Sequence, residues 1–328
     1  MRRGFICFLV IFILFGWVAL NSKALADEKY PATLIKLIIP TEAGADGDTL
    51  LRPLLEKVSA RLGQPIVVIN KPGAGGALGY LELHDAKPDG HTIGLGFPTI
   101  FINKMRGVLP YDHRGFTVVC QHASFTPIVV ASTKTARPFK TIQEVLSFAK
   151  SNPGKVSVAI SGVGQSWWVA AMLFQSGTGL DFHMIPQAGS GAIAVTQAAG
   201  GHADLAVVGL ASGLSQIEAG NVRFIATYGE KRVSGKYSHV PTFKELGYNI
   251  TWDSINFIMG PPKMPAPIVD KLAKVFKEEA TKPEFQEYAI RMNATPIYRG
   301  PDETVKYLDE QSQVCRKIME KAGLLKEK

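Results

Sequence analysis

The sequence is poor in cysteine and lacks the motifs of the common enzyme classes. It has three cysteines, and Cys120 and Cys315 are too far apart to suggest a disulfide framework or a redox pair, so we expect them to be buried free thiols. No serine has a glycine both two residues before and two residues after it, which argues against a hydrolase nucleophile elbow. No two histidines have zinc-binding spacing. We therefore expect no catalytic residue, no metal and no cofactor; the alternative is an exported α/β enzyme, a hydrolase or an oxidoreductase that acts on a small carboxylate.

The sequence also lacks the dense basic runs of nucleic-acid-binding proteins. Its 36 Lys and Arg outnumber its 28 Asp and Glu, which gives a net charge of +8, but they are scattered along the chain. We therefore expect no nucleic-acid partner. A mildly positive protein instead suits a small anionic ligand.

A long hydrophobic run occurs once, at the N-terminus. Arg2 and Arg3 precede an uncharged, mostly apolar run over residues 4–20, and residues 24–26 (Ala-Leu-Ala) then offer a cleavage site. This order is typical of a secretory signal peptide and predicts a periplasmic, soluble and monomeric protein, cleaved after Ala26. An uncleaved anchor is the alternative, although the run falls short of the roughly 20 apolar residues of a membrane span.

Past this run, segments typical of strands and helices alternate. Short apolar runs predict buried strands, and apolar stripes every three to four residues predict helices, the first with Asp48 as its N-cap. The pattern is typical of an α/β fold with a parallel sheet, and its restart near Pro127 divides the chain into two lobes. Lobe one is expected over 27–127 and 250–328, with strands 34–40, 65–69, 91–97 and 295–299 and helices 48–62, 76–86, 266–281, 283–292 and 301–324. Lobe two is expected as an insertion over 128–249, with strands 127–134, 155–161, 182–186, 203–209 and 222–228 and helices 141–152, 166–176 and 190–200.

A glycine-rich loop, NKPGAGGALG at residues 70–79, follows the second expected strand. Counted from Gly73, its spacing misses the dinucleotide fingerprint because Leu78 takes the place of the last glycine, and the chain has no Gly-Lys-Ser or Gly-Lys-Thr of a phosphate loop. Bare N–H groups beside a helix start can still hold an anion. The loop alone leaves two interpretations open, an anion site and a tight turn without a ligand.

The other expected strands also end in small residues. Gly, Ala, Ser or Thr dominate the loops after residues 40, 69, 95, 160, 186 and 208. Ligands of open α/β sheets bind outside the carboxyl ends of the strands, so two facing lobes would present several helix N-termini to one cleft. Aligned amides and helix dipoles there favour a carboxylate or a phosphate.

These loops resemble those of the Bug-type solute receptors, the extracytoplasmic binding proteins of tripartite tricarboxylate transporters. The resemblance covers essentially the whole mature chain. It implies a two-lobed periplasmic-binding-protein (Venus flytrap) fold, each lobe a sheet flanked by helices, and capture of a small organic carboxylate for delivery to a membrane permease. The motifs that carry it are LIKLIIPTEAGADGD, GQPIVVINKPGAGGALG, DGHTIGLG, LPYD, SGVGQS, GSGAI with GGHADL, IEAGNVRFIATYGEKR and HVPTFKELGY.

The resemblance also implies which residues bind the ligand. The loops after the first two strands would hold one carboxylate through backbone N–H groups and water, with Asp48 orienting the first loop, while lobe two would contact the rest of the molecule. The matching residues are Ala43, Gly44, Asp48, Gly73, Ala74, Gly75, Gly76 and Thr99 in lobe one, and Ser161, Gly164, Gln165, Ser166, Trp167, Gln187, Gly189 and Ser190 in lobe two.

The chain departs from the family pattern where lobe two would contact the ligand. Trp167 and Trp168 replace small polar residues and a histidine, and Val208 and Gly209 stand where many members carry an aspartate. A tryptophan in the cleft would favour an aromatic or long apolar carboxylate over an aliphatic amino acid. The alternative is that both tryptophans lie in the helix core; at adjacent positions at least one of them should.

Overall fold

The computed structural model describes residues 30–187, 191–233 and 235–326. The expected signal peptide and two candidate site residues, Gly189 and Ser190, lie outside the described residues. Over the described part of the chain, no helix is both long and apolar enough to cross a membrane. Within the same part, Cys120 and Cys315 are buried and unpaired, as the sequence predicts.

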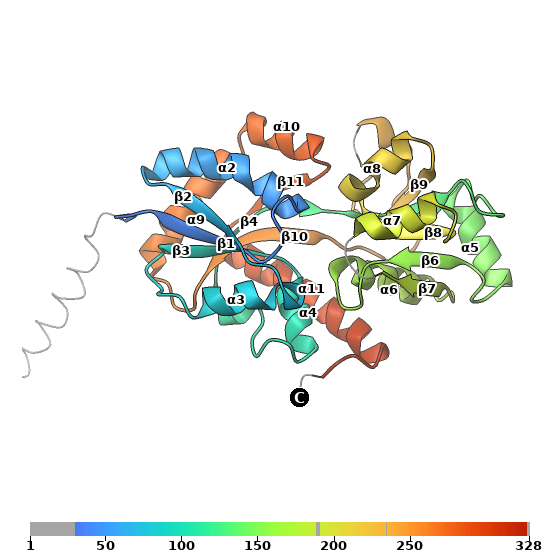
Figure 1. Ribbon diagram of the computed structural model, residues 1–328, viewed down its shortest axis with the longest axis horizontal. Coiled ribbons are helices and arrows are strands. Elements are labelled where there is room, and N and C mark those ends of the chain that lie inside the picture. Colours follow the sequence, from blue (N-terminus) through green and yellow to red (C-terminus); the bar gives the residue numbers. More distant parts are fainter. Residues whose placement is uncertain (1–29, 188–190, 234, 327–328) are drawn as a thin grey trace, which may run out of the picture.

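The strands form two separate sheets that lie end to end along the long axis of the molecule (Figure 1). The first has the strand order β11-β4-β10-β3-β1-β2 and the second has the order β7-β6-β8-β5-β9. In the first sheet β1 lies between two parallel neighbours, so that Ile38 is opposite both Ile69 and Gly94. The first sheet contains β1 (Ile35–Ile39), β2 (Ile66–Asn70), β3 (Thr92–Gly96), β4 (Thr117–Phe125), β10 (Ser254–Gly260) and β11 (Thr295–Arg299), and the second contains β5 (Pro127–Ser132), β6 (Ser157–Ile160), β7 (His183–Pro186), β8 (Leu205–Gly209) and β9 (Val222–Thr227).

Helices cover both sheets, which confirms the α/β fold of two lobes, each a sheet flanked by helices (Figure 1). In the first lobe the apolar stripe of α2, with Leu50, Leu54 and Val58 fully or almost fully buried, packs with α9 and α10 in one core cluster. The helices of the first lobe are α2 (Asp46–Leu62), α3 (Ala77–His84), α4 (Thr99–Met105), α9 (Ala266–Ala280), α10 (Pro283–Arg291) and α11 (Pro301–Lys321). Those of the second are α5 (Ile142–Ser151), α6 (Ser166–Thr178), α7 (Gly191–Ala199) and α8 (Leu210–Glu218).

One hydrophobic core cluster continues from one lobe into the other. It joins Leu308 and Cys315 of α11 to Trp168 and Phe174 of α6. α11 therefore packs against both lobes, and apolar burial of this kind is the main favourable term that holds packed elements together.

Within the described residues the chain crosses between the two sheets twice. Thr126 separates β4 from β5, and residues 228–253 lead from β9 back to β10. The Thr126 hydroxyl donates a hydrogen bond of 2.6 Å to Asp253, which joins the two crossings. The sheets lie on either side of these crossings; the residue boundaries expected for the lobes stay a prediction.

Two expectations about lobe one are wrong in detail. The first sheet is mixed rather than parallel, because β4 and β10 run antiparallel to their neighbours. Neither strand was predicted, since polar residues such as Gln121 and His122 interrupt the apolar pattern of β4 although both are fully buried. Asp48 is not the N-cap of the first helix either: α2 begins at Asp46, after Ala45, and Asp48 lies in the first turn.

Candidate functional site

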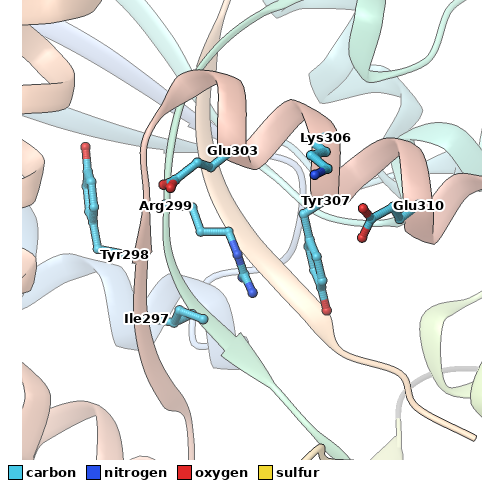
Figure 2. Close-up of a pocket in the computed structure, with 7 residues that line it drawn as sticks. All are labelled: Ile297, Tyr298, Arg299, Glu303, Lys306, Tyr307 and Glu310. Atoms are coloured by element: carbon cyan, nitrogen blue, oxygen red, sulfur yellow. The ribbon is translucent and has the colours of Figure 1, made fainter.

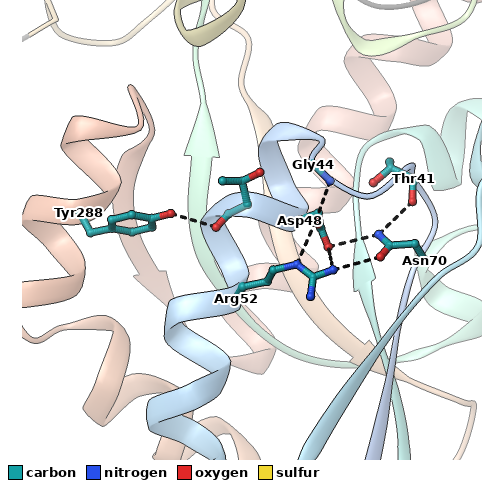
Figure 3. Close-up of polar contacts among 7 residues, drawn as sticks. Thr41, Gly44, Asp48, Arg52, Asn70 and Tyr288 are labelled. Atoms are coloured by element: carbon teal, nitrogen blue, oxygen red, sulfur yellow. Dashed lines mark hydrogen bonds and ion pairs between the residues drawn. The ribbon is translucent and has the colours of Figure 1, made fainter.

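The loop after β1 is held by a buried carboxylate. Asp48, 2% exposed, accepts the Gly44 N–H at 2.8 Å and two hydrogen bonds from Arg52, at 2.8 and 3.0 Å (Figure 3). Asn70, the last residue of β2, donates through Nδ2 both to Asp48 and to the Thr41 carbonyl, at 3.2 Å each. The side chain of Asp48 thus fixes the backbone of the loop that carries Ala43 and Gly44 rather than projecting from it.

Asp48 is held in its charged form. Burial alone raises the pKa of a carboxyl, but the hydrogen bonds from Arg52, Gly44 and Asn70 and the charge of Arg52 outweigh it, so the pKa of Asp48 lies below its ordinary value. Because the folded-state pKa is the lower one, the stabilisation is present above the unfolded-state pKa, about 3.9, and is lost as the pH falls through the folded-state pKa.

We expect Asp48→Asn to lower the free energy of unfolding at pH 7 by about 1–3 kcal/mol, because it removes charge-assisted hydrogen bonds from a buried site. Urea unfolding of parent and variant should show this difference shrinking as the pH is lowered below about 4. A difference independent of pH would contradict the assignment of the effect to the ionised carboxylate.

The glycine loop after β2 is a left-handed turn. Gly73, Ala74, Gly75 and Gly76 have φ angles of 121°, 49°, 67° and 93°. The Gly76 N–H donates to the Gly73 carbonyl at 2.9 Å, whereas the Gly75 N–H has no acceptor among the described residues. A left-handed φ is costly for a residue with a side chain, such as Ala74, and backbone strain of this kind concentrates at binding sites. The conformation therefore favours an anion site over a simple turn.

α4, which was not predicted, supports this loop from the side. Its Asn103, almost fully buried, donates through Nδ2 to the Gly75 carbonyl at 3.0 Å. Thr99 lies one turn earlier on the same side of α4, and its hydroxyl is 3.1 Å from the hydroxyl of buried Tyr80. The candidate Thr99 is thus adjacent to the supports of the glycine loop.

The facing loop of lobe two joins β6 to α6. Ser161 is fully buried, and its hydroxyl has no hydrogen-bond partner among the described residues. Ser166 begins α6, and its hydroxyl accepts the indole N–H of Trp252 at 3.1 Å. Of these two candidate serines, Ser161 is the one whose hydroxyl is uncommitted.

Two candidate glutamines border the same loop. A Cβ built on Gly162 would be 3.5 Å from Gln165 Nε2 and 3.5 Å from the Gln187 carbonyl. The side chain of Gln187 donates to the Ile185 carbonyl at 3.1 Å. Gln165 is thus part of the Ser161–Ser166 loop, and Gln187 of the next loop lies beside it.

The two tryptophans have different environments. Trp168 is 4% exposed and belongs to the core cluster shared by the lobes, whereas Trp167 is half-buried. Trp167 lies over the ends of two other segments of lobe two: a Cβ on Gly209 would be 3.0 Å from its Cζ2, and a Cβ on Gly191 would be 3.2 Å from its Cδ1. Its indole also packs against the core cluster of lobe one, so it lies between the lobes.

The structure adds residues that the sequence did not single out. Asn70 and Arg52 fix Asp48, and Asn103 fixes Gly75. Gly209, which the sequence marked only as a departure from the family pattern, leaves room for Trp167 because it has no side chain. Only the i, i+4 spacing of Asp48 and Arg52 is a local signal in the sequence.

A separate hollow of about 450 Å³ lies between β11 and α11, away from these loops (Figure 2). Arg299 on its wall donates to Gln121 at 2.7 Å and lies 4.1 Å from the ring centre of Tyr307. Tyr307 in turn lies beside Asp253 of the second crossing. Arg299 and Tyr307 are thus partnered within the protein, and none of the residues that line the hollow is a predicted ligand residue. In the described residues no group of three His, Cys, Asp or Glu side chains could hold a metal ion.

Comparison with known proteins gives consistent matches along the chain. The sequence model of the tripartite tricarboxylate transporter family receptors matches residues 50–324. A protein from Cupriavidus necator, "UPF0065 protein in gbd 5'region", is 31% identical over 95% of this chain and 94% of its own length. The crystal structure of a TctC solute-binding protein from Polaromonas has a TM-score of 0.77 at 26% identity and covers 89% of this chain and 99% of its own. The periplasmic binding protein BugD has a TM-score of 0.73 at 26% identity, with 90% and 99% covered.

Proposed function

This chain belongs to the family of tripartite tricarboxylate transporter receptors, and we propose that it captures a small organic carboxylate between its two lobes and delivers it to the permease of such a transporter. Receptors of this family bind solutes and are not enzymes, so the alternative of an exported hydrolase or oxidoreductase is set aside.

The observation that carries the proposal is the left-handed glycine loop. Its Gly75 N–H is unpaired within the described residues, its carbonyl is fixed by Asn103, and α3 begins directly after it. A carboxylate gains there from free donors and from the positive end of the helix dipole. The loop of Gly44, held by Asp48, lies at the end of the neighbouring strand β1, and Ser161 offers a hydroxyl from lobe two.

The half-buried Trp167 supports a ligand with an aromatic or long apolar body. Its indole takes the space beside Gly209, and an indole face in a cleft stacks on flat or extended apolar groups. Two proteins from Rhodopseudomonas palustris share the fold, with TM-scores of 0.77 and 0.73, and their structures contain adipate and malate. At 23% and 22% identity these two establish the fold alone; their ligands agree with the carboxylate class proposed here.

We also propose that the protein acts in the periplasm as a monomer, after cleavage of the signal peptide at Ala26. The basis is the order of Arg2, Arg3, the apolar run and Ala-Leu-Ala at 24–26. Sequencing of the exported chain should begin at Asp27; a membrane-bound chain that retains residues 5–20 would contradict this.

A thermal-shift screen against mono-, di- and aromatic carboxylates tests the function. A ligand that binds the native state at 100 times its Kd adds about 2.7 kcal/mol of stability, which should raise Tm by about 5 °C. The matched controls are the corresponding amides, which keep the carbon skeleton and lose the charge. If no carboxylate stabilises the protein more than its amide does, the proposed function is wrong.

A further inference from the structure

Arg106 extends from lobe one onto the binding loop of lobe two. It directly follows α4, three residues after Asn103, and is therefore on the same side of the helix. A Cβ built on Gly164 would lie 2.7 Å from Arg106 Cδ, 2.9 Å from Nε and 3.0 Å from Nη1. The guanidinium thus lies directly against the backbone of the loop after β6, where a side chain at position 164 would displace it.

The charge of Arg106 has no counter-ion within the described residues. Neither a carboxylate nor a carbonyl there pairs with its guanidinium, although the side chain is half-buried. Other arginines of the fold are paired: Arg52 with Asp48 and Arg114 with Asp309, each at 2.8 Å. The C-terminal end of α4 accounts for part of the stabilisation of a cation at this position. A half-buried guanidinium still gains most from a carboxylate that it can bind through two parallel hydrogen bonds.

The position of Arg106 relates it to the proposed carboxylate site. Asn103 holds the glycine loop through the Gly75 carbonyl, and Arg106 lies about 4.5 Å further along the axis of α4, at a rise of 1.5 Å per residue. α4 therefore places the uncharged Asn103 at the glycine loop and, further along the helix, the cationic Arg106 against Gly164. A ligand that begins at the glycine loop and extends along α4 towards lobe two would bring its far end to the guanidinium.

We propose that Arg106 binds a second carboxylate at the far end of the ligand, so that the receptor selects dicarboxylates over monocarboxylates. The inference rests on the proposed function, because the first carboxylate is placed at the glycine loop. It assigns to Arg106 a selectivity that backbone contacts to one carboxylate need not supply. Gly164 is part of the same site, since its missing side chain lets the guanidinium reach lobe two.

The test compares acids that share a skeleton and differ by one carboxylate: hexanoate with adipate, and benzoate with 1,4-benzenedicarboxylate. Calorimetric titration is performed on the parent chain, Arg106→Gln, Arg106→Lys and Gly164→Ala. We expect Arg106→Gln to weaken the bound diacid at least tenfold and its monoacid less than twofold. Arg106→Lys should lie between, because an ammonium lacks the planar fork. Gly164→Ala, which displaces the guanidinium and keeps its charge but also strains the backbone at a φ of 81°, should lower the preference for the diacid as well.

The control is Arg291→Gln, which removes the same charge from an exposed position at the end of α10 and should change neither affinity. Equal losses for diacid and monoacid in Arg106→Gln would reduce Arg106 to a structural role and overturn the proposal. A parent chain that binds neither diacid, or prefers the monoacid, would also overturn it while leaving a carboxylate receptor intact. A parent chain that binds no carboxylate in the wider screen contradicts the proposed function itself.

Discussion

Gly75→Val is expected to weaken carboxylate binding by at least tenfold, equivalent to about 1.4 kcal/mol. Gly75 has a φ of 67°, and its N–H is the donor that we place opposite the carboxylate. A Cβ there would lie 3.2 Å from Asn103 Oδ1, so a valine must displace the side chain that fixes the loop. A branched residue also tolerates the left-handed region poorly, at a cost of about 1–2 kcal/mol or more.

Two further variants separate binding from backbone strain. Asn adopts the left-handed conformation more readily than other side chains, so Gly75→Asn adds a Cβ with less strain and should still weaken binding. Gly63→Val imposes the strain at a φ of 73°, where the new Cβ would meet nothing within 4 Å beyond its neighbours in the chain. Gly63 follows the C-terminal end of α2, a helix about 25 Å long, whereas Asn70 contacts Asp48 in the first turn of that helix. Gly63→Val should lower Tm without changing affinity. Carboxylate affinity is measured by calorimetry on the folded variants. If Gly75→Val binds the carboxylate as tightly as the parent does, the glycine loop is only a turn.

Trp167→Ala and Trp168→Ala are expected to act on different properties. Trp168, 4% exposed, lies in the core cluster shared by both lobes, so its truncation should cost about 3–5 kcal/mol of unfolding free energy. Trp167 is half-buried between the lobes, and its loss should cost less stability. We expect Trp167→Ala instead to weaken an aromatic carboxylate at least tenfold relative to an aliphatic one, because it removes the indole on which the ring would stack.

Two variants test the environment of the Trp167 indole. Trp167→Phe keeps part of the aromatic surface and should retain part of the preference for aromatic ligands. Gly209→Ala places a Cβ 3.0 Å from Trp167 Cζ2 at a backbone φ of −72°, so it shifts the indole without backbone strain. Urea unfolding and calorimetry on the same preparations give both readouts. An aromatic preference that survives Trp167→Ala would contradict the contact between this side chain and the ligand.

The sequence by itself determined the α/β alternation and most element bounds. Amphipathic stripes and apolar runs are local signals, so helices such as α5 and α9 begin and end within one or two residues of the expected positions. Three of the family motifs reach into loops at the carboxyl ends of strands, which is where the structure places Gly44, Gly75 and Ser161. The ligand-binding roles of these residues stay predictions that the variants above test.

Only the tertiary structure decided which neighbours each residue meets. Trp167 and Trp168 are about 100° apart around α6, and the sequence cannot say which direction faces the core until the sheet and α11 are in place. β4 was hidden because its polar residues are buried by packing rather than marked by an apolar run, and α4 was hidden because it is short. Asn103 and Arg106 therefore had no local signal: their partners, Gly75 and Gly164, are distant in sequence and are brought to them by the fold.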